Sequence, residues 1–219
     1  MHMRIVKNLM VVVLMGTIGL CPKSGWAASR TSLAFENSWI SQTADFNKYK
    51  EVFIDSLDLR GMVLQVWDED SGEYDRKFLK ADILEAVGQR MYSAFAENIR
   101  LVMTVNDGEM GKTDIPALVI KMRLKAEIHA QEDRLLMNMV NQSLGKAGEP
   151  FTLMFECDIT DQNSGEKLIT VSDAAQFTSE SASAPFSSAE DLDQLTAAFN
   201  TWALRLADLI GKYRSQPGS

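Results

Sequence analysis

The stretch that decides the fold of this chain is residues 150–178, PFTLMFECDITDQNSGEKLITVSDAAQFT. Apolar and polar residues alternate along both of its arms, which is the period of a half-buried strand. One face of the first arm collects Phe151, Leu153, Phe155, Cys157 and Ile159, and one face of the second arm collects Ile169, Val171, Ala175 and Phe177. Residues 161–166 between the arms are turn formers, so the stretch predicts a β-hairpin with one buried face.

Two segments with helical periodicity are available to cover that buried face. Residues 77–98 place apolar side chains at four-residue steps, namely Leu79, Ile83, Val87, Met91 and Phe95. A second stripe follows Ser188, a predicted N-cap, and consists of Leu192, Leu195, Phe199, Trp202, Leu206, Leu209 and Tyr213. Both stripes recur at three or four residues, which indicates amphipathic helices lying on a sheet.

Further strands are predicted at 51–59, 62–67, 99–105 and 118–129, whereas 132–145 reads equally as a strand or as a short helix. The run at 118–129 alternates most clearly, which favours an antiparallel sheet covered on one side. The sequence therefore predicts an α+β fold: a two-layer sandwich with a mainly antiparallel sheet of about five to seven strands and two helices on one face.

The first 27 residues have the pattern of a secretory signal peptide. Arg4 and Lys7 precede an apolar core, and Ala27 ends a small-x-small cleavage pattern. Cys21 follows the core where a bacterial lipoprotein carries its lipidated cysteine, but the bulky Leu20 before it opposes lipidation; both fates of Cys21 stay open. We divide the chain into a signal peptide (1–27), a partly ordered lead-in (28–48), one α+β domain (49–214) and a disordered tail (215–219).

The charge balance argues against nucleic acid and anionic lipid as partners. The chain has a formal net charge of −8, and cleavage after Ala27 removes Arg4, Lys7 and Lys23 without removing an acidic residue. An acidic body with no basic run repels phosphate-rich surfaces. We expect a periplasmic protein, which contacts the membrane only if Cys21 is lipidated at the outer membrane.

The strand at 118–129 carries the one basic concentration of the body, Lys121, Arg123 and Lys125, on its polar face. Glu156 and Asp158 occupy the polar face of the hairpin. These five residues form our candidate interaction face. Pairing between the strands is the favoured interpretation, and an acidic partner on the basic row is the alternative.

Residues for common catalytic and metal chemistry are scarce after the signal peptide. His129 and Cys157 are the remaining histidine and cysteine, which leaves no local partner for a nucleophilic triad and almost no basis for a zinc site. Cys157 shares the apolar face of the hairpin, so we expect a small buried side chain in preference to an intermolecular disulfide. We predict no cofactor, no metal and no enzymatic activity.

Three short motifs resemble a family of uncharacterised bacterial envelope proteins, defined by a domain of unknown function in predicted outer-membrane lipoproteins. They are Phe155-x-x-x-Ile159-x-Asp161-x-x-Ser164-Gly165-Glu166 in the hairpin, Thr201-Trp202-Ala203-x-x-Leu206 in the last helix, and Tyr49-Lys50-x-Val52-x-Ile54-Asp55 in the first strand. The resemblance implies a Gram-negative envelope location and no catalytic residues. This chain differs from the lipid-anchored members of that family at Leu20, where lipidation requires a small residue.

These features predict a non-catalytic exported protein that acts by protein–protein interaction in the cell envelope. The alternative is a periplasmic carrier of a small ligand or lipid, which would use a cavity between the sheet and its helices.

Overall fold

The computed structural model describes residues 34–55, 57–68, 73–108, 115–130, 149–179 and 186–215, all within one compact unit that spans 32–219. Our expectations for the signal peptide, for Cys21 and for 132–145 lie outside the described residues, as does all of the expected tail except Ser215. The helical elements are a 3₁₀ helix η1 (Phe46–Lys48), α1 (Ala81–Ile99) and α3 (Ala189–Arg214). The strands are β1 (Asn37–Ile40), β2 (Glu51–Ile54), β3 (Asp58–Asp68), β4 (Glu73–Phe78), β5 (Thr104–Val105), β6 (Ala117–Ala130), β7 (Glu149–Asp161) and β8 (Lys167–Ser179).

The described strands form one eight-stranded sheet in which β6 is the hub. Along the main path the order is β1-β8-β7-β6-β2-β5. β6 pairs with β7 on one edge, and on its other edge it pairs first with β2 and then with β3, both parallel to it. The hairpins β7–β8 and β3–β4 and the pairs β6–β7 and β1–β8 are antiparallel, so the predicted mainly antiparallel sheet is confirmed.

The predicted hairpin is the pair β7–β8, and its two faces are as expected. Register pairs Phe151 with Phe177 and Cys157 with Val171, so each pair lies on one face of the sheet. All five apolar residues of the β7 face are buried, together with Ile169, Val171 and Phe177 of β8. A bulge near Ile159 and Thr160 gives β8 an extra residue, Leu168, which is also buried.

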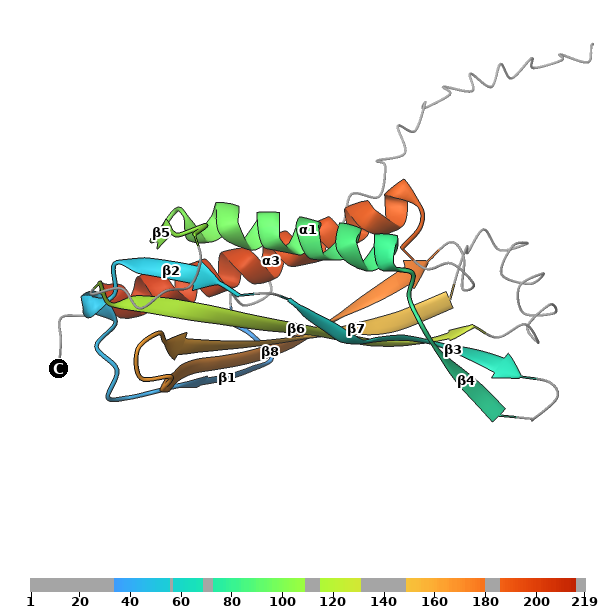
Figure 1. Ribbon diagram of the computed structural model, residues 1–219, viewed down its shortest axis with the longest axis horizontal. Helices are drawn as coiled ribbons and strands as arrows, with labels where there is room; N and C mark the ends of the chain where they lie inside the picture. The colour runs from blue at the N-terminus through green and yellow to red at the C-terminus, as the bar shows by residue number, and fades with distance from the viewer. Residues whose placement is uncertain are drawn as a thin grey trace, which may run out of the picture. The chain divides into compact units, whose positions relative to one another are not determined.

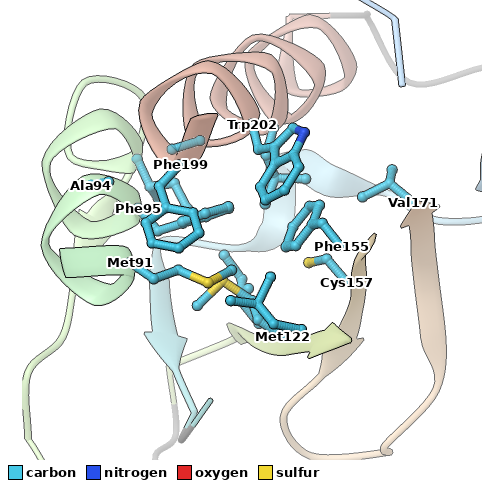
Figure 2. Close-up of a cluster of buried hydrophobic side chains, with 14 of the residues drawn as sticks. Met91, Ala94, Phe95, Met122, Phe155, Cys157, Val171, Phe199 and Trp202 are labelled. Atoms are coloured by element: carbon cyan, nitrogen blue, oxygen red, sulfur yellow. The ribbon is translucent and has the colours of Figure 1, made fainter. Parts of the chain in front are cut away.

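Both helices lie over that buried face, and Figure 1 shows α1 and α3 side by side on the same side of the sheet. The predicted two-layer α+β architecture is therefore confirmed. Figure 2 shows the core between the layers, where Met91 and Phe95 of α1 and Phe199 and Trp202 of α3 meet Phe155 of β7. The Trp202 ring stacks on the Phe155 ring, with centroids 4.9 Å apart and planes 11° from parallel.

A largely buried ion pair adds a polar contact between the layers. Asp173 of β8 lies on the helix side of the sheet, and Arg205 of α3 donates a hydrogen bond to its Oδ2. Removing one partner from such a pair leaves an uncompensated charge in a desolvated position. The contact therefore constrains where α3 lies along β8.

Several strand boundaries differ from the prediction, for reasons of packing. Ile99 still belongs to α1, and only Thr104–Val105 forms a strand, because Ile99 and Met103 are apolar to fill the core rather than to pair. The helix predicted from residue 77 begins at Ala81 instead, and Glu73–Phe78 forms β4 against β3. β2 ends at Ile54 and β3 begins at Asp58, so the two strands separate earlier in the chain than the prediction of strands at 51–59 and 62–67 had it. Besides the six predicted strands, the described part of the chain forms β1 and β4.

The turn of the β7–β8 hairpin is anchored by Asp161, the aspartate of the family-like motif. Its Oδ1 accepts hydrogen bonds from the backbone N–H groups of Asn163 and Ser164, at 2.8 and 3.0 Å. Its Oδ2 accepts a hydrogen bond of 2.7 Å from the buried Tyr49 and lies 3.4 Å from Lys48 Nζ. Gly165 takes the left-handed conformation that closes the turn, with φ at 71°.

Burial of Asp161 alone would raise its pKa, but the hydrogen bonds from Ser164, Tyr49 and Asn163 outweigh it and lower the pKa well below its usual range. A carboxylate whose pKa is lowered by folding stabilises the fold above its unfolded pKa of about 4, and this contribution is lost as the pH falls through the lower folded value.

We therefore predict that Asp161→Asn lowers the free energy of unfolding at pH 7 and that the difference from the native chain shrinks below about pH 4. Urea denaturation followed by circular dichroism between pH 2 and pH 7 measures both. Tyr49→Phe, which removes one donor and keeps the carboxylate, should cost about 1.5–3 kcal/mol at pH 7, as expected for a hydrogen bond to a charged group. A difference that stays constant across the pH range would contradict the assignment.

Candidate functional site: the open face of the sheet

The face of the sheet opposite the helices presents polar residues in rows that follow the strand register. We call it the open face and define it by its residues in β3, β6, β7, β8 and β1. One row, the Lys121 row, crosses four strands and consists of Lys121, Asp158, Thr170 and Trp39. The next row, the Arg123 row, consists of Arg123, Glu156, Ser172 and Asn37. Four of the five residues of the predicted interaction face lie in these two rows. The fifth, Lys125, lies opposite Met154.

Glu156 binds the two cations nearest to it on β6. Arg123 Nη1 donates to Glu156 Oε2 at 3.1 Å, and Lys125 Nζ donates to Oε1 at 2.5 Å. The hydrogen bond from Lys125, together with those from Arg123, lowers the pKa of Glu156. The cross-strand pairing that the sequence favoured is therefore present for Arg123 and Lys125.

The same network continues onto β3 through Asp58. Arg60 binds both carboxylate oxygens of Asp58, at 2.9 and 2.8 Å, and Arg123 Nε lies 3.3 Å from Asp58 Oδ2. The hydrogen bonds from Arg60 lower the pKa of Asp58 well below its usual range. Three strands thus share one chain of alternating charges.

Asp158 turns the opposite way, toward β8. Its Oδ1 accepts a hydrogen bond of 2.7 Å from Thr170, and its Oδ2 lies 3.0 Å from Lys167 Nζ. Lys121, which lies directly opposite Asp158 in the register, has no ion pair with any residue that the structure describes. The expected pairing between Lys121 and Asp158 is therefore absent from the described contacts, and the Lys121 side chain is exposed.

Gly61 shapes the edge of this face because β3 and β6 approach closely there. A Cβ atom at Gly61 would lie 2.6 Å from Lys125 Cγ and 3.0 Å from the Leu124 carbonyl oxygen. The missing side chain lets the Lys125 stem lie against β3 while its ammonium reaches Glu156. A side chain here would have to displace either that stem or the backbone of β6.

Two large apolar side chains are also exposed on the open face, Trp39 at 53% and Met154 at 42%. Trp39 belongs to the segment that we expected to be a partly ordered lead-in, so its place beside Thr170 was not predicted. Ile40 packs against the core and Trp39 points away from it, as successive side chains of a strand do. Residues 37–40 have two polar residues followed by two apolar ones, so no alternating pattern was available to predict this.

The remaining candidates from the sequence are a thiol and a histidine. Cys157 is buried against the core, and burial raises the pKa of its thiol well above its usual range, so it is unsuited to nucleophilic or disulfide chemistry. The prediction of a small buried side chain is confirmed. His129 lies in β6, where its backbone pairs with Gln65. No group of metal-ligating side chains gathers among the residues whose side chains are described.

A hollow of about 310 Å³ lies between α1 and the break that separates β2 from β3. Its floor is apolar, with Ile54, Leu57, Leu59 and Met122, and its rim carries Asp55, Glu85, Gln89 and Tyr92. Gly88 of α1 borders it, and a Cβ atom there would meet only Leu59, at 3.8 Å. The hollow is thus open space beside a helical glycine.

Comparisons with known proteins give only distant structural similarity. No family model matches the chain, and no curated protein matches it. Solved structures that match include PelC from Paraburkholderia phytofirmans, a dodecamer in its crystals, with 8% identity, 77% of this chain and 97% of that chain covered, and a TM-score of 0.38. Protein XCC0632 from Xanthomonas campestris, a DUF330 protein, matches with 7% identity over 77% of this chain and 89% of that chain, at a TM-score of 0.41.

Lipoprotein GNA1162 from Neisseria meningitidis also matches, with 11% identity, 68% of this chain and 94% of that chain covered, and a TM-score of 0.25. Structural neighbours therefore include a DUF330 protein and a lipoprotein. At these identities and scores we take no functional argument from them. None of the helices that the structure describes is long and apolar enough to cross a membrane.

We predict that Gly61→Ala destabilises the protein by about 1–3 kcal/mol, because the added methyl group overpacks the approach of β3 to β6. In a double-mutant cycle, Lys125→Ala should recover part of that loss by removing the Lys125 Cγ atom. Urea denaturation measures all four proteins of the cycle.

Gly88→Ala is the matched control, because its methyl group has room. It should stabilise α1, by up to about 1 kcal/mol, through the higher helix propensity of alanine. Equal effects of the two glycine substitutions would show that the close approach at Gly61 does not matter.

Proposed function

We propose that this chain is a non-catalytic exported protein that acts in the cell envelope by binding another protein through its open face. The observation that carries the proposal is a sheet face that no described helix covers, on which charged side chains are held by ion pairs around the exposed Trp39 and Met154. Fixed charges and exposed aromatic or methionine side chains are features of protein-binding surfaces.

The electrostatics of the open face favour binding over catalysis. General acids and bases work best with a pKa near the working pH. The pKa values of Glu156 and Asp58 are instead lowered by their cationic neighbours, so both stay ionised near neutral pH. Their role is to hold Arg123 and Lys125 in place.

An envelope location is supported by the sequence pattern of the first 27 residues and by the family-like motifs. Within the proposal, the protein lies in the periplasm and is attached to the outer membrane if Cys21 is lipidated. The anchored and the free forms present the same open face.

The proposal predicts that a photo-crosslinking phenylalanine derivative at Met154 captures a discrete partner in intact cells, because this side chain is exposed on the open face. The matched control is Leu204 of α3, which is 48% exposed on the helical layer. Immunoblotting of the irradiated cells should give a crosslinked band with the probe at 154 and none with it at 204. No band at 154, or the same bands from both positions, would refute the proposal.

The second candidate function is a carrier of a small apolar ligand, and the hollow beside Gly88 is the observation that favours it. Its volume is near the lower end of the range of about 300–1,000 Å³ for ligand sites. It ranks second because a carrier requires most of the ligand surface to be buried, and this hollow is open at its rim.

If the chain is a carrier, native mass spectrometry of protein purified from its envelope should show a bound ligand, and Gly88→Leu should abolish the added mass by filling the hollow. Ser93→Leu adds the same side chain to the exposed side of α1 and should retain the ligand. The bare polypeptide mass in the native chain would refute this candidate.

A further inference from the structure

The described part of the open face gathers basic side chains in a protein that is acidic overall. Among the side chains of β3, β6 and β7 that the structure describes on this face, the cations are Arg60, Lys121, Arg123 and Lys125, and the carboxylates are Asp58, Glu156 and Asp158. Lys167 of β8 adds a further cation. The whole chain carries a net charge of −8. The described cations of this face, unlike the charge of the chain as a whole, favour a negatively charged partner.

Among the described cations of this face, Lys121 is the one for which no ion pair is described. Arg123 and Lys125 are already bound to Glu156. Asp158 would have to give up its contacts with Thr170 and Lys167 to reach Lys121. An incoming carboxylate can therefore bind Lys121 without breaking any described contact.

A single exposed ion pair contributes at most about 1 kcal/mol, so a charge alone does not make a docking site. Trp39 supplies the apolar contact that the ion pair lacks. It lies in the same row as Lys121, three strands away, and half of its side chain is exposed. Exposed tryptophans are frequent anchors of binding energy at interfaces.

The spacing between the two groups specifies the partner further. Three strand spacings of about 4.8 Å place Trp39 roughly 14 Å from Lys121. An extended chain advances about 3.3 Å per residue, so residues i and i+4 lie on one side of it about 13 Å apart.

From this arrangement we infer that the open face binds an extended acidic segment of a partner protein across its strands. A carboxylate of the segment pairs with Lys121, and an apolar side chain four residues away packs on Trp39. The inference rests on the proposed function and names the chemistry of the partner that the open face takes.

The test uses the full exported chain and synthetic nine-residue peptides carrying a fluorescent label. One peptide has glutamate and leucine four residues apart in a serine and threonine background, and its control has lysine in place of glutamate. Fluorescence anisotropy at low and at high salt measures binding. The glutamate peptide should bind more tightly than the lysine peptide, and added salt should weaken it.

Lys121→Glu should weaken binding of the glutamate peptide by about ten-fold and Trp39→Ser by about ten- to thirty-fold. Lys80→Glu is the matched control, because it makes the same charge change at an exposed residue before α1 and should leave the affinity unchanged. Equal binding of both peptides, or equal losses from Lys121→Glu and Lys80→Glu, would overturn the inference.

The crosslink at position 154 separates this inference from the proposed function. A captured partner whose yield does not fall with Lys121→Glu leaves the proposed function standing and overturns the acidic segment. A crosslinked species of twice the chain mass also overturns it, because a second copy would then occupy the face. If no crosslink forms at position 154, the proposed function itself is refuted.

Discussion

The structure depends on the register between β7 and its two neighbours. Side chains alternate between the faces of a strand, so a shift of one residue would replace the buried side chains of β7 by its open-face side chains, which apart from Met154 are mostly polar. Phe155 would then lose its stacking contact with Trp202, and Glu156 would enter the core. The same register that buries one face therefore places the charges of the other face in rows.

Asp161 is the residue that secures this register at the hairpin end. One carboxylate oxygen organises the turn, and the other accepts the Tyr49 hydroxyl from the chain that leads into β2. Because Tyr49 is buried, its hydrogen bond to Asp161 is shielded from water and costly to lose. The structure thus gives the aspartate of the family-like motif an architectural role.

Alternation and helical periodicity were sufficient to predict the hairpin, both helices and the two faces, since burial along β7 follows the sequence pattern residue by residue. The pattern could not show the direction in which each carboxylate turns. Glu156 and Asp158 look equivalent in sequence, yet one binds β6 cations and the other binds Thr170 and Lys167. β1 and β4 were missed because short edge strands form through tertiary pairing, which local propensity does not record.

The break between β2 and β3 affects both faces of the sheet. β6 is long enough to pair with both strands in turn, and its register shifts between Asp58 and Gly61. On the helix side the break leaves the hollow beside Gly88. Past the break, Gly61 lets the Lys125 stem lie against β3, so that Lys125 and Arg123 both reach Glu156. With Glu156 held by these two cations and Asp158 held by β8, Lys121 is the β6 cation that remains for a partner.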